Sequence, residues 1–196
     1  MDESLLTNET DTNVTKETEA SLSYDEYRPS KEIVLKKHII AAVGMNLIDI
    51  IKDNSPYFNY ITKDKFYLSN LPSISLIDYI NRLVKYTNMD ISTLINAVIY
   101  VDNFCEKNNY ILCMNNVYLV FLSACLLSIK FNEDVPINLK NYSQISGISL
   151  ENLINLEFSL YSNLHFDLFV KEDLYQSYYD YFSNYEISWL KKGKEL

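Results

Sequence analysis

Four charged residues in predicted helices are candidates for an ion pair or for contact with a binding partner. They are Arg82, Asp102, Lys130 and Glu157. An ionised group among apolar neighbours is costly unless an opposite charge or several hydrogen-bond donors meet it. Asp102, Lys130 and Glu157 therefore each either pair inside the fold or contact a binding partner. Arg82 instead shares the polar face of its helix with Asp78, and an exposed i, i+4 pair between them is the simplest expectation.

Glu157 is the clearest case. At about 100° per residue it falls in the middle of an apolar helical stripe, formed by Leu150, Leu153, Ile154, Leu160, Tyr161 and Leu164. Asp102 similarly shares a predicted helix face with apolar residues, namely Ile91, Ile95, Val98 and Cys105. Lys130 ends a nearly all-apolar helix, where its ammonium group favours the negative end of the dipole and can reach outward. For Lys130 and Glu157, spacing leaves an internal salt bridge and a binding pair equally open, whereas Arg82 and Asp102 favour a structural role.

The sequence does not predict an enzyme, a cofactor or a metal site. Its three glycines leave little material for a phosphate-binding loop. His38 and His165 are far apart, and neither has a second ligand at metal spacing. Cys105 and Cys113 lack a CxxC partner.

Charge and cysteine content limit the partners and the compartment. A formal net charge of -9 provides no basic surface for nucleic acid. An odd number of cysteines, three, in apolar stretches indicates reduced thiols and an intracellular protein of the nucleus, the cytoplasm or both. The longest apolar segment, 117–129, is shorter than the roughly 20 residues of a membrane span, so we expect no membrane segment.

The elements that position these residues are predicted to be helices. Residues 1–30 are expected to form a disordered acidic tail and 31–53 an N-terminal helix with Gly44 at its middle. A linker, 54–72, precedes a helical domain at 73–170, and a C-terminal helical extension occupies 171–196. Within the domain, periodicity and capping residues predict five helices with boundaries near 75–86, 90–107, 115–131, 138–146 and 149–164. The third has almost no polar face, so the others must surround it.

Four segments together resemble the cyclin box, and within that family the short P/U-type cyclins related to the fungal phosphate-regulon cyclins. The segments are "SISLIDYINRLVKYT", "LINAVIYVDNF", "NNVYLVFLSACLLSIKFNED" and "SGISLENLINLEFSLYSNLHFDLFV". The more specific features are the arginine in the first helix, a Tyr-x-Asp near the end of the second, an Ala-x5-Lys-Phe followed by two acidic residues, and the Leu-Glu of the fifth. The resemblance covers roughly residues 66–170 and implies an all-α five-helix bundle with a central third helix.

The resemblance also implies roles for individual residues. Arg82 and Asp102 would form a buried ion pair between the first two helices. Lys130 and Glu157 would contact backbone groups of a kinase C-helix and its adjoining loop. Apolar contacts to the kinase would come from Leu126, Phe131 and Leu153.

The function implied by the resemblance is that of a regulatory subunit without catalytic chemistry. It would form a heterodimer with a cyclin-dependent serine/threonine protein kinase and hold the kinase C-helix in the active position. The alternative is a cyclin-fold adaptor that binds a non-kinase protein, because fold does not fix function.

Overall fold

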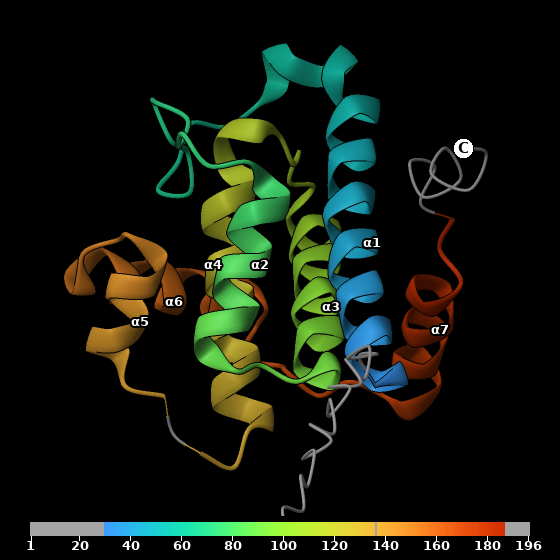
Figure 1. Cartoon of the computed structure of the whole chain (residues 1–196). Helices are drawn as coiled ribbons and strands as arrows, with labels where there is room; N and C mark the ends of the chain where they lie inside the picture. Colours follow the sequence, from blue (N-terminus) through green and yellow to red (C-terminus); the bar gives the residue numbers. More distant parts are fainter. Residues whose placement is uncertain (1–29, 136, 187–196) are drawn as a thin grey trace, which may run out of the picture.

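The computed structural model describes residues 30–135 and 137–186, and this part of the chain is built from helices and loops (Figure 1). The predicted acidic tail, apart from Ser30, and the basic end after residue 186 lie outside the described residues. The bounds are α1 Lys31–Asp53, the 3-10 helix η1 Ser55–Tyr60, α2 Leu76–Thr87, α3 Ile91–Asn108, α4 Met114–Asn132, α5 Leu139–Ser146, α6 Leu150–Asn163 and α7 Glu172–Ser183. The predicted all-α class is confirmed.

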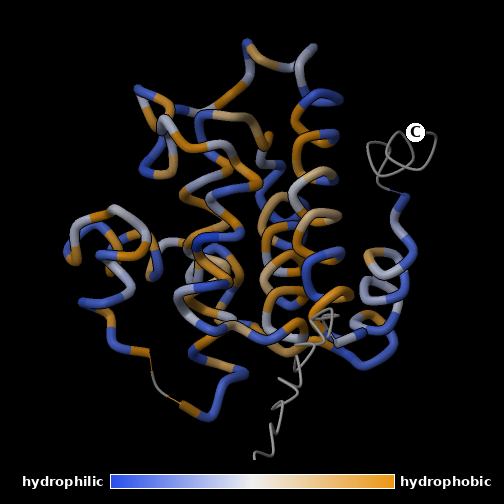
Figure 2. Tube along the Cα trace, viewed as in Figure 1, coloured by the Kyte–Doolittle hydropathy of each residue, from blue (hydrophilic) through white to orange (hydrophobic). Residues whose placement is uncertain are grey.

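Helix α4 is the centre of the fold. Every residue from Asn116 to Ile129 is buried, and α4 packs mainly against α3 and α6, with α2 also in contact. Figure 2 shows orange, hydrophobic stretches along these inner helices, whereas the outlying α7 is more blue and white. Among the described residues α4 also has the length and composition of a membrane span, but most of it is buried as in a core helix.

Capping residues explain where the helices begin and end. The side chains of Ser75 and Ser149 accept hydrogen bonds from backbone N–H groups in the first turns of α2 and α6, as N-cap residues do. Helices α2 and α3 end at Asn88 and Asn109, which adopt the left-handed conformation in place of glycine. Gly147 does the same after α5, with φ of 75°. These local signals account for the agreement between the predicted and observed helix ends.

The segment predicted as a linker is held firmly to the bundle. Phe66 is 1% exposed and packs edge-on against Phe104 and Tyr110. The Leu68 N–H donates to the Asn115 carbonyl at 2.7 Å. This segment therefore forms part of the folded body, covering the N-terminal end of α4.

Gly44 lies where α1 crosses α2. A Cβ atom at this position would be 2.8 Å from Cγ1 of Ile77 and 3.5 Å from its Cα. The first distance is shorter than carbon atoms tolerate, so either the Ile77 side chain or one of the helices would have to shift. A glycine that lowers intrinsic helix propensity is thus required for close packing of α1 on α2.

We predict that Gly44→Ala lowers the free energy of unfolding by roughly 1 kcal/mol, because overpacking outweighs the gain in helix propensity. In an Ile77→Ala background, which removes Cγ1, the same substitution should instead be neutral or stabilising. Urea denaturation of the four proteins in this double-mutant cycle measures the coupling. A Gly44→Ala effect that is the same in both backgrounds would contradict the explanation.

Candidate functional site

Lys130 and Glu157 form an ion pair between α4 and α6. Lys130 Nζ donates to Glu157 Oε1 at 2.5 Å. The lysine side chain is 38% exposed and the glutamate side chain 15% exposed, so the pair lies at the edge of the core. Lys130 is in the last turn of α4, where the helix dipole favours a cation. The structure thus joins two residues that the sequence left either as an internal pair or as a binding pair.

The apolar residues expected beside this pair need correction. Leu126 and Leu153 are each 0% exposed and belong to the core, so a partner cannot contact them without unfolding the bundle. Phe131 is 56% exposed, as a contact residue requires. Periodicity had identified the apolar face of each helix without showing that neighbouring helices already cover it.

Two exposed apolar residues on α6 were not assigned to the site from the sequence. Ile154 is 46% exposed and Phe158 is 64% exposed, and they flank Glu157 along the helix. The apolar stripe predicted for this helix is in fact divided: Leu153 and Leu160 are buried in the core, whereas Ile154 faces outward. The sequence contained one signal for this: Phe158 lies outside the predicted apolar stripe, so its aromatic ring was not expected to be buried in the core. We call the set Lys130, Phe131, Ile154, Glu157 and Phe158 the α4–α6 patch.

The predicted ion pair between Arg82 and Asp102 is wrong. Arg82 Nε donates to the Ile145 carbonyl of α5 at 2.7 Å. Asp102 Oδ2 accepts a hydrogen bond from the Tyr178 hydroxyl of α7 at 2.8 Å. The two side chains are directed toward different helices, α5 and α7, and each has its own partner there.

Among residues 30–135 and 137–186, Asp102 is therefore a carboxylate without a cation partner. Burial raises its pKa above the ordinary value, and the hydrogen bond from Tyr178 offsets only part of that effect. Desolvation also raises the pKa of the nearby Cys105 thiol to about 12, with the Asp102 charge as a second cause. The thiols of all three cysteines are free.

The described residues contain no group of three or more His, Cys, Asp or Glu that could hold a metal ion. His38 lies in α1, and His165 lies after α6 with a positive φ of 59°. The structure does not bring either histidine into the α4–α6 patch, whose polar groups are one ammonium and one carboxylate. Such a surface can orient a partner through charge and apolar contact.

Comparison with known proteins gives a consistent result. The model of the family described as "Cyclin" matches residues 4–168. Cyclin-U4-3 of Arabidopsis thaliana is 32% identical over 126 residues, which cover 64% of this chain and 57% of the relative. The PHO85 cyclin-like protein psl1 of Schizosaccharomyces pombe is 27% identical over 130 residues, covering 65% and 52%. The chain spans about half the length of the curated relatives it matches.

These observations define an all-α helical bundle built around one buried helix, with a charged and apolar patch at its edge. With a family match over most of its length, the chain belongs to the cyclin family. Its relatives include plant U-type cyclins and a fungal PHO85 cyclin-like protein, which confirms the resemblance to P/U-type cyclins.

The half-buried Asp102 gives a pH prediction. Its raised pKa means that the folded state holds the proton more tightly than the unfolded chain, so ionisation reduces stability. As pH rises from about 3.8, the ordinary value, through the raised pKa, the wild type should lose stability relative to Asp102→Asn. Denaturant titrations of both proteins between pH 4 and 7 measure this difference. A constant difference across that range would contradict it.

Proposed function

We propose that this chain is the regulatory subunit of a cyclin-dependent serine/threonine protein kinase and activates it by holding its C-helix in the active position. The observation that carries the proposal is the Lys130–Glu157 pair, fixed between two helices and flanked by exposed apolar side chains. The cyclin family match and the similarity to the PHO85 cyclin-like protein psl1 support a kinase partner.

The pair is suited to binding backbone groups. An ammonium group has three donors and a carboxylate about four acceptor positions, and the bond between Lys130 and Glu157 uses one of each. The remaining donors of Lys130 can reach carbonyl groups at a helix end of the kinase, and the remaining acceptor positions of Glu157 can take N–H groups. Because the pair is already formed, little side-chain entropy is lost when the partner binds.

The apolar residues of the α4–α6 patch supply buried contact area, which the ion pair alone does not provide. Phe131, Ile154 and Phe158 expose large side chains on either side of the pair. Burying them against a kinase removes apolar surface from water, and aromatic residues at the centre of an interface contribute strongly to affinity.

Activation then follows from differential affinity. A protein kinase is active when its C-helix glutamate pairs with the strand lysine. A cyclin surface that fits the inward C-helix better than the outward one shifts the kinase toward the active state by that difference in affinity. No catalytic group from the cyclin is needed for this effect.

A charge-swap experiment separates binding from structure. The double variant Lys130→Glu with Glu157→Lys keeps an internal ion pair but presents reversed charges to a partner. We expect kinase binding to weaken at least about tenfold, because reversed charges oppose the complementary groups of the kinase, while the melting temperature stays near that of wild type. Pull-down from extract, with phosphorylation of a histone substrate as readout, measures both binding and activation.

The control for the swap is the pair Lys52–Asp49 on α1, joined at 2.8 Å and exposed. Reversing Lys52 and Asp49 should leave kinase binding unchanged. Equal kinase capture by both swapped proteins would show that the α4–α6 patch is not the interface. If the wild type captures a non-kinase protein instead and no kinase, the adaptor function replaces the one proposed.

Phe131 provides a second prediction. Phe131→Ala should reduce kinase affinity by roughly tenfold or more, the effect of removing a central aromatic contact, with little change in stability because the ring is exposed. Phe58 in η1, which is 61% exposed, is the matched control, and Phe58→Ala should bind like wild type. Titration calorimetry with the purified kinase distinguishes the two; indistinguishable affinities would exclude Phe131 from the interface.

A further inference from the structure

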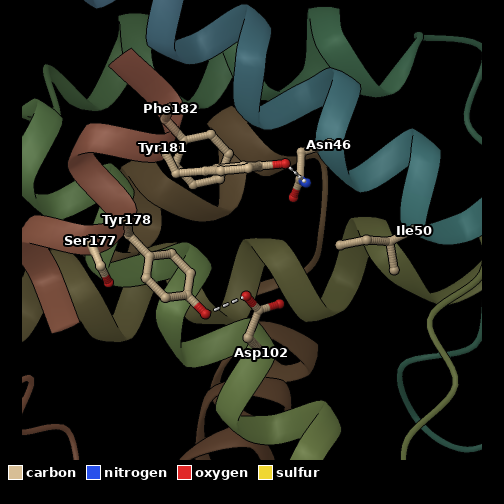
Figure 3. Close-up of a pocket in the computed structure, with 7 residues that line it drawn as sticks. All are labelled: Asn46, Ile50, Asp102, Ser177, Tyr178, Tyr181 and Phe182. Carbon is tan, nitrogen blue, oxygen red and sulfur yellow. Dashed lines mark hydrogen bonds between the residues drawn. The ribbon is translucent and has the colours of Figure 1, made fainter. Parts of the chain in front are cut away.

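A pocket with an unpaired carboxylate lies between α1, α3 and α7, formed by elements outside the α4–α6 patch (Figure 3). Its volume is about 320 Å³. The lining residues are Asn46, Ile50, Asp102, Ser177, Tyr178, Tyr181 and Phe182. Figure 3 shows Asp102 and the Tyr178 hydroxyl directed toward each other, with Asn46 and Tyr181 meeting on the α1 side.

The Asp102 carboxylate in this pocket has fewer hydrogen-bond and charge partners than an ionised group away from water requires. Tyr178 donates one hydrogen bond to Oδ2, and no cation contributes to the electrostatics of Asp102 among the described residues. A carboxylate has about four acceptor positions. Most of the positions on Asp102 are therefore available to a ligand that carries N–H donors and positive charge.

A comparison with Asp49 shows which partner Asp102 lacks. It also accepts a hydrogen bond from a tyrosine hydroxyl, that of Tyr185, at 3.0 Å. Unlike Asp102, it has an ammonium partner, Lys52, at 2.8 Å, and the hydrogen bond from Lys52 is the main reason that its pKa is lowered. Of these two carboxylates, each bound by a tyrosine hydroxyl, the more buried one has no cation partner within the described part of the chain.

The rest of the pocket suits an organic cation. Tyr178, Tyr181 and Phe182 contribute aromatic rings, whose faces attract cations. Asn46 Nδ2 donates to the Tyr181 hydroxyl at 3.1 Å, which leaves the amide oxygen as a further acceptor. The lining residues carry one negative charge and no positive one. An anion would meet the Asp102 charge, and a neutral apolar ligand would leave that charge desolvated and unpaired.

We propose that this pocket binds an organic cation, namely a guanidinium or primary ammonium group on a short alkyl chain. The N–H groups donate to Asp102 and Asn46, and the alkyl stem packs against the aromatic rings and Ile50. The cation is that of a free small molecule or of an arginine or lysine side chain, since both present the same group. The site is independent of the proposed kinase interface.

The test is an NMR titration of the full chain with n-propylguanidinium or n-butylammonium, following the Asn46 side-chain amide and the ring signals of Tyr178 and Tyr181. We expect saturable shifts at these groups. The neutral analogue n-pentanol should bind at least tenfold more weakly, and equal binding of the alcohol would overturn the proposal. A blocked tripeptide containing arginine, compared with n-propylguanidinium, shows by its relative affinity whether a protein side chain or a small molecule is preferred.

Two variants locate the site. Asp102→Asn should weaken binding of either cation at least tenfold, whereas Asp49→Asn, which removes the same charge outside the pocket, should change it less than twofold. Equal losses in both variants would mean that net charge alone attracts the ligand. Circular dichroism verifies that each variant is folded.

A second design leaves the Asp102 carboxylate unchanged. Ser177 is an exposed lining residue of α7, so Ser177→Arg can place a guanidinium over the pocket without disturbing the core. It should compete with added cation and weaken binding at least tenfold, whereas Ser177→Gln should bind like wild type. Unchanged binding by Ser177→Arg, or no saturable shift in the wild type, would overturn the assignment.

Discussion

The structure depends on the burial of α4 on all sides. A helix whose residues from Asn116 to Ile129 are all buried cannot be stable alone in water, because almost its entire surface is apolar. The other helices are arranged to cover it, chiefly α3 and α6. The helix reaches solvent only at its ends, so its one charged residue must lie at one of them. Lys130 is at one such end, and the position of the α4–α6 patch follows from this constraint.

The helices could be predicted because their signals are local. The buried stripe of α2, its cap at Ser75 and its left-handed end at Asn88 lie within a few residues of one another. The role of Gly44 was not readable, since it depends on Ile77 in another helix. From the sequence alone Gly44 only weakens α1; in the fold it permits α1 to approach α2. Likewise, the segment predicted as a linker is ordered by Phe66, whose partners lie in and after α3.

Part of the candidate site was also predictable, because some of its signals are local. Charge at an apolar position singled out Lys130 and Glu157 without knowledge of their contact. Residue spacing shows on which side of a helix a residue lies, but not whether another helix covers that side. The fully buried Leu126 and Leu153 therefore could not be distinguished from the exposed Phe131. The pairing of Arg82 with Asp102 failed because the actual partners, Ile145 and Tyr178, belong to α5 and α7. How those helices pack is a tertiary property.

The attachment of α7 differs in kind from the packing around α4. Only Phe182 of this helix is buried. The hydroxyl groups of Tyr178 and Tyr185 donate hydrogen bonds to Asp102 and Asp49, and the Tyr181 hydroxyl accepts one from Asn46. Elements with few buried apolar contacts open most readily, so α7 should be among the least stable parts of the bundle. A cation bound between Asp102 and the α7 rings would stabilise the docked helix by linkage. A ligand of the proposed pocket would thus be coupled to the docking of α7, whereas the α4–α6 patch lies at the end of the most completely buried helix.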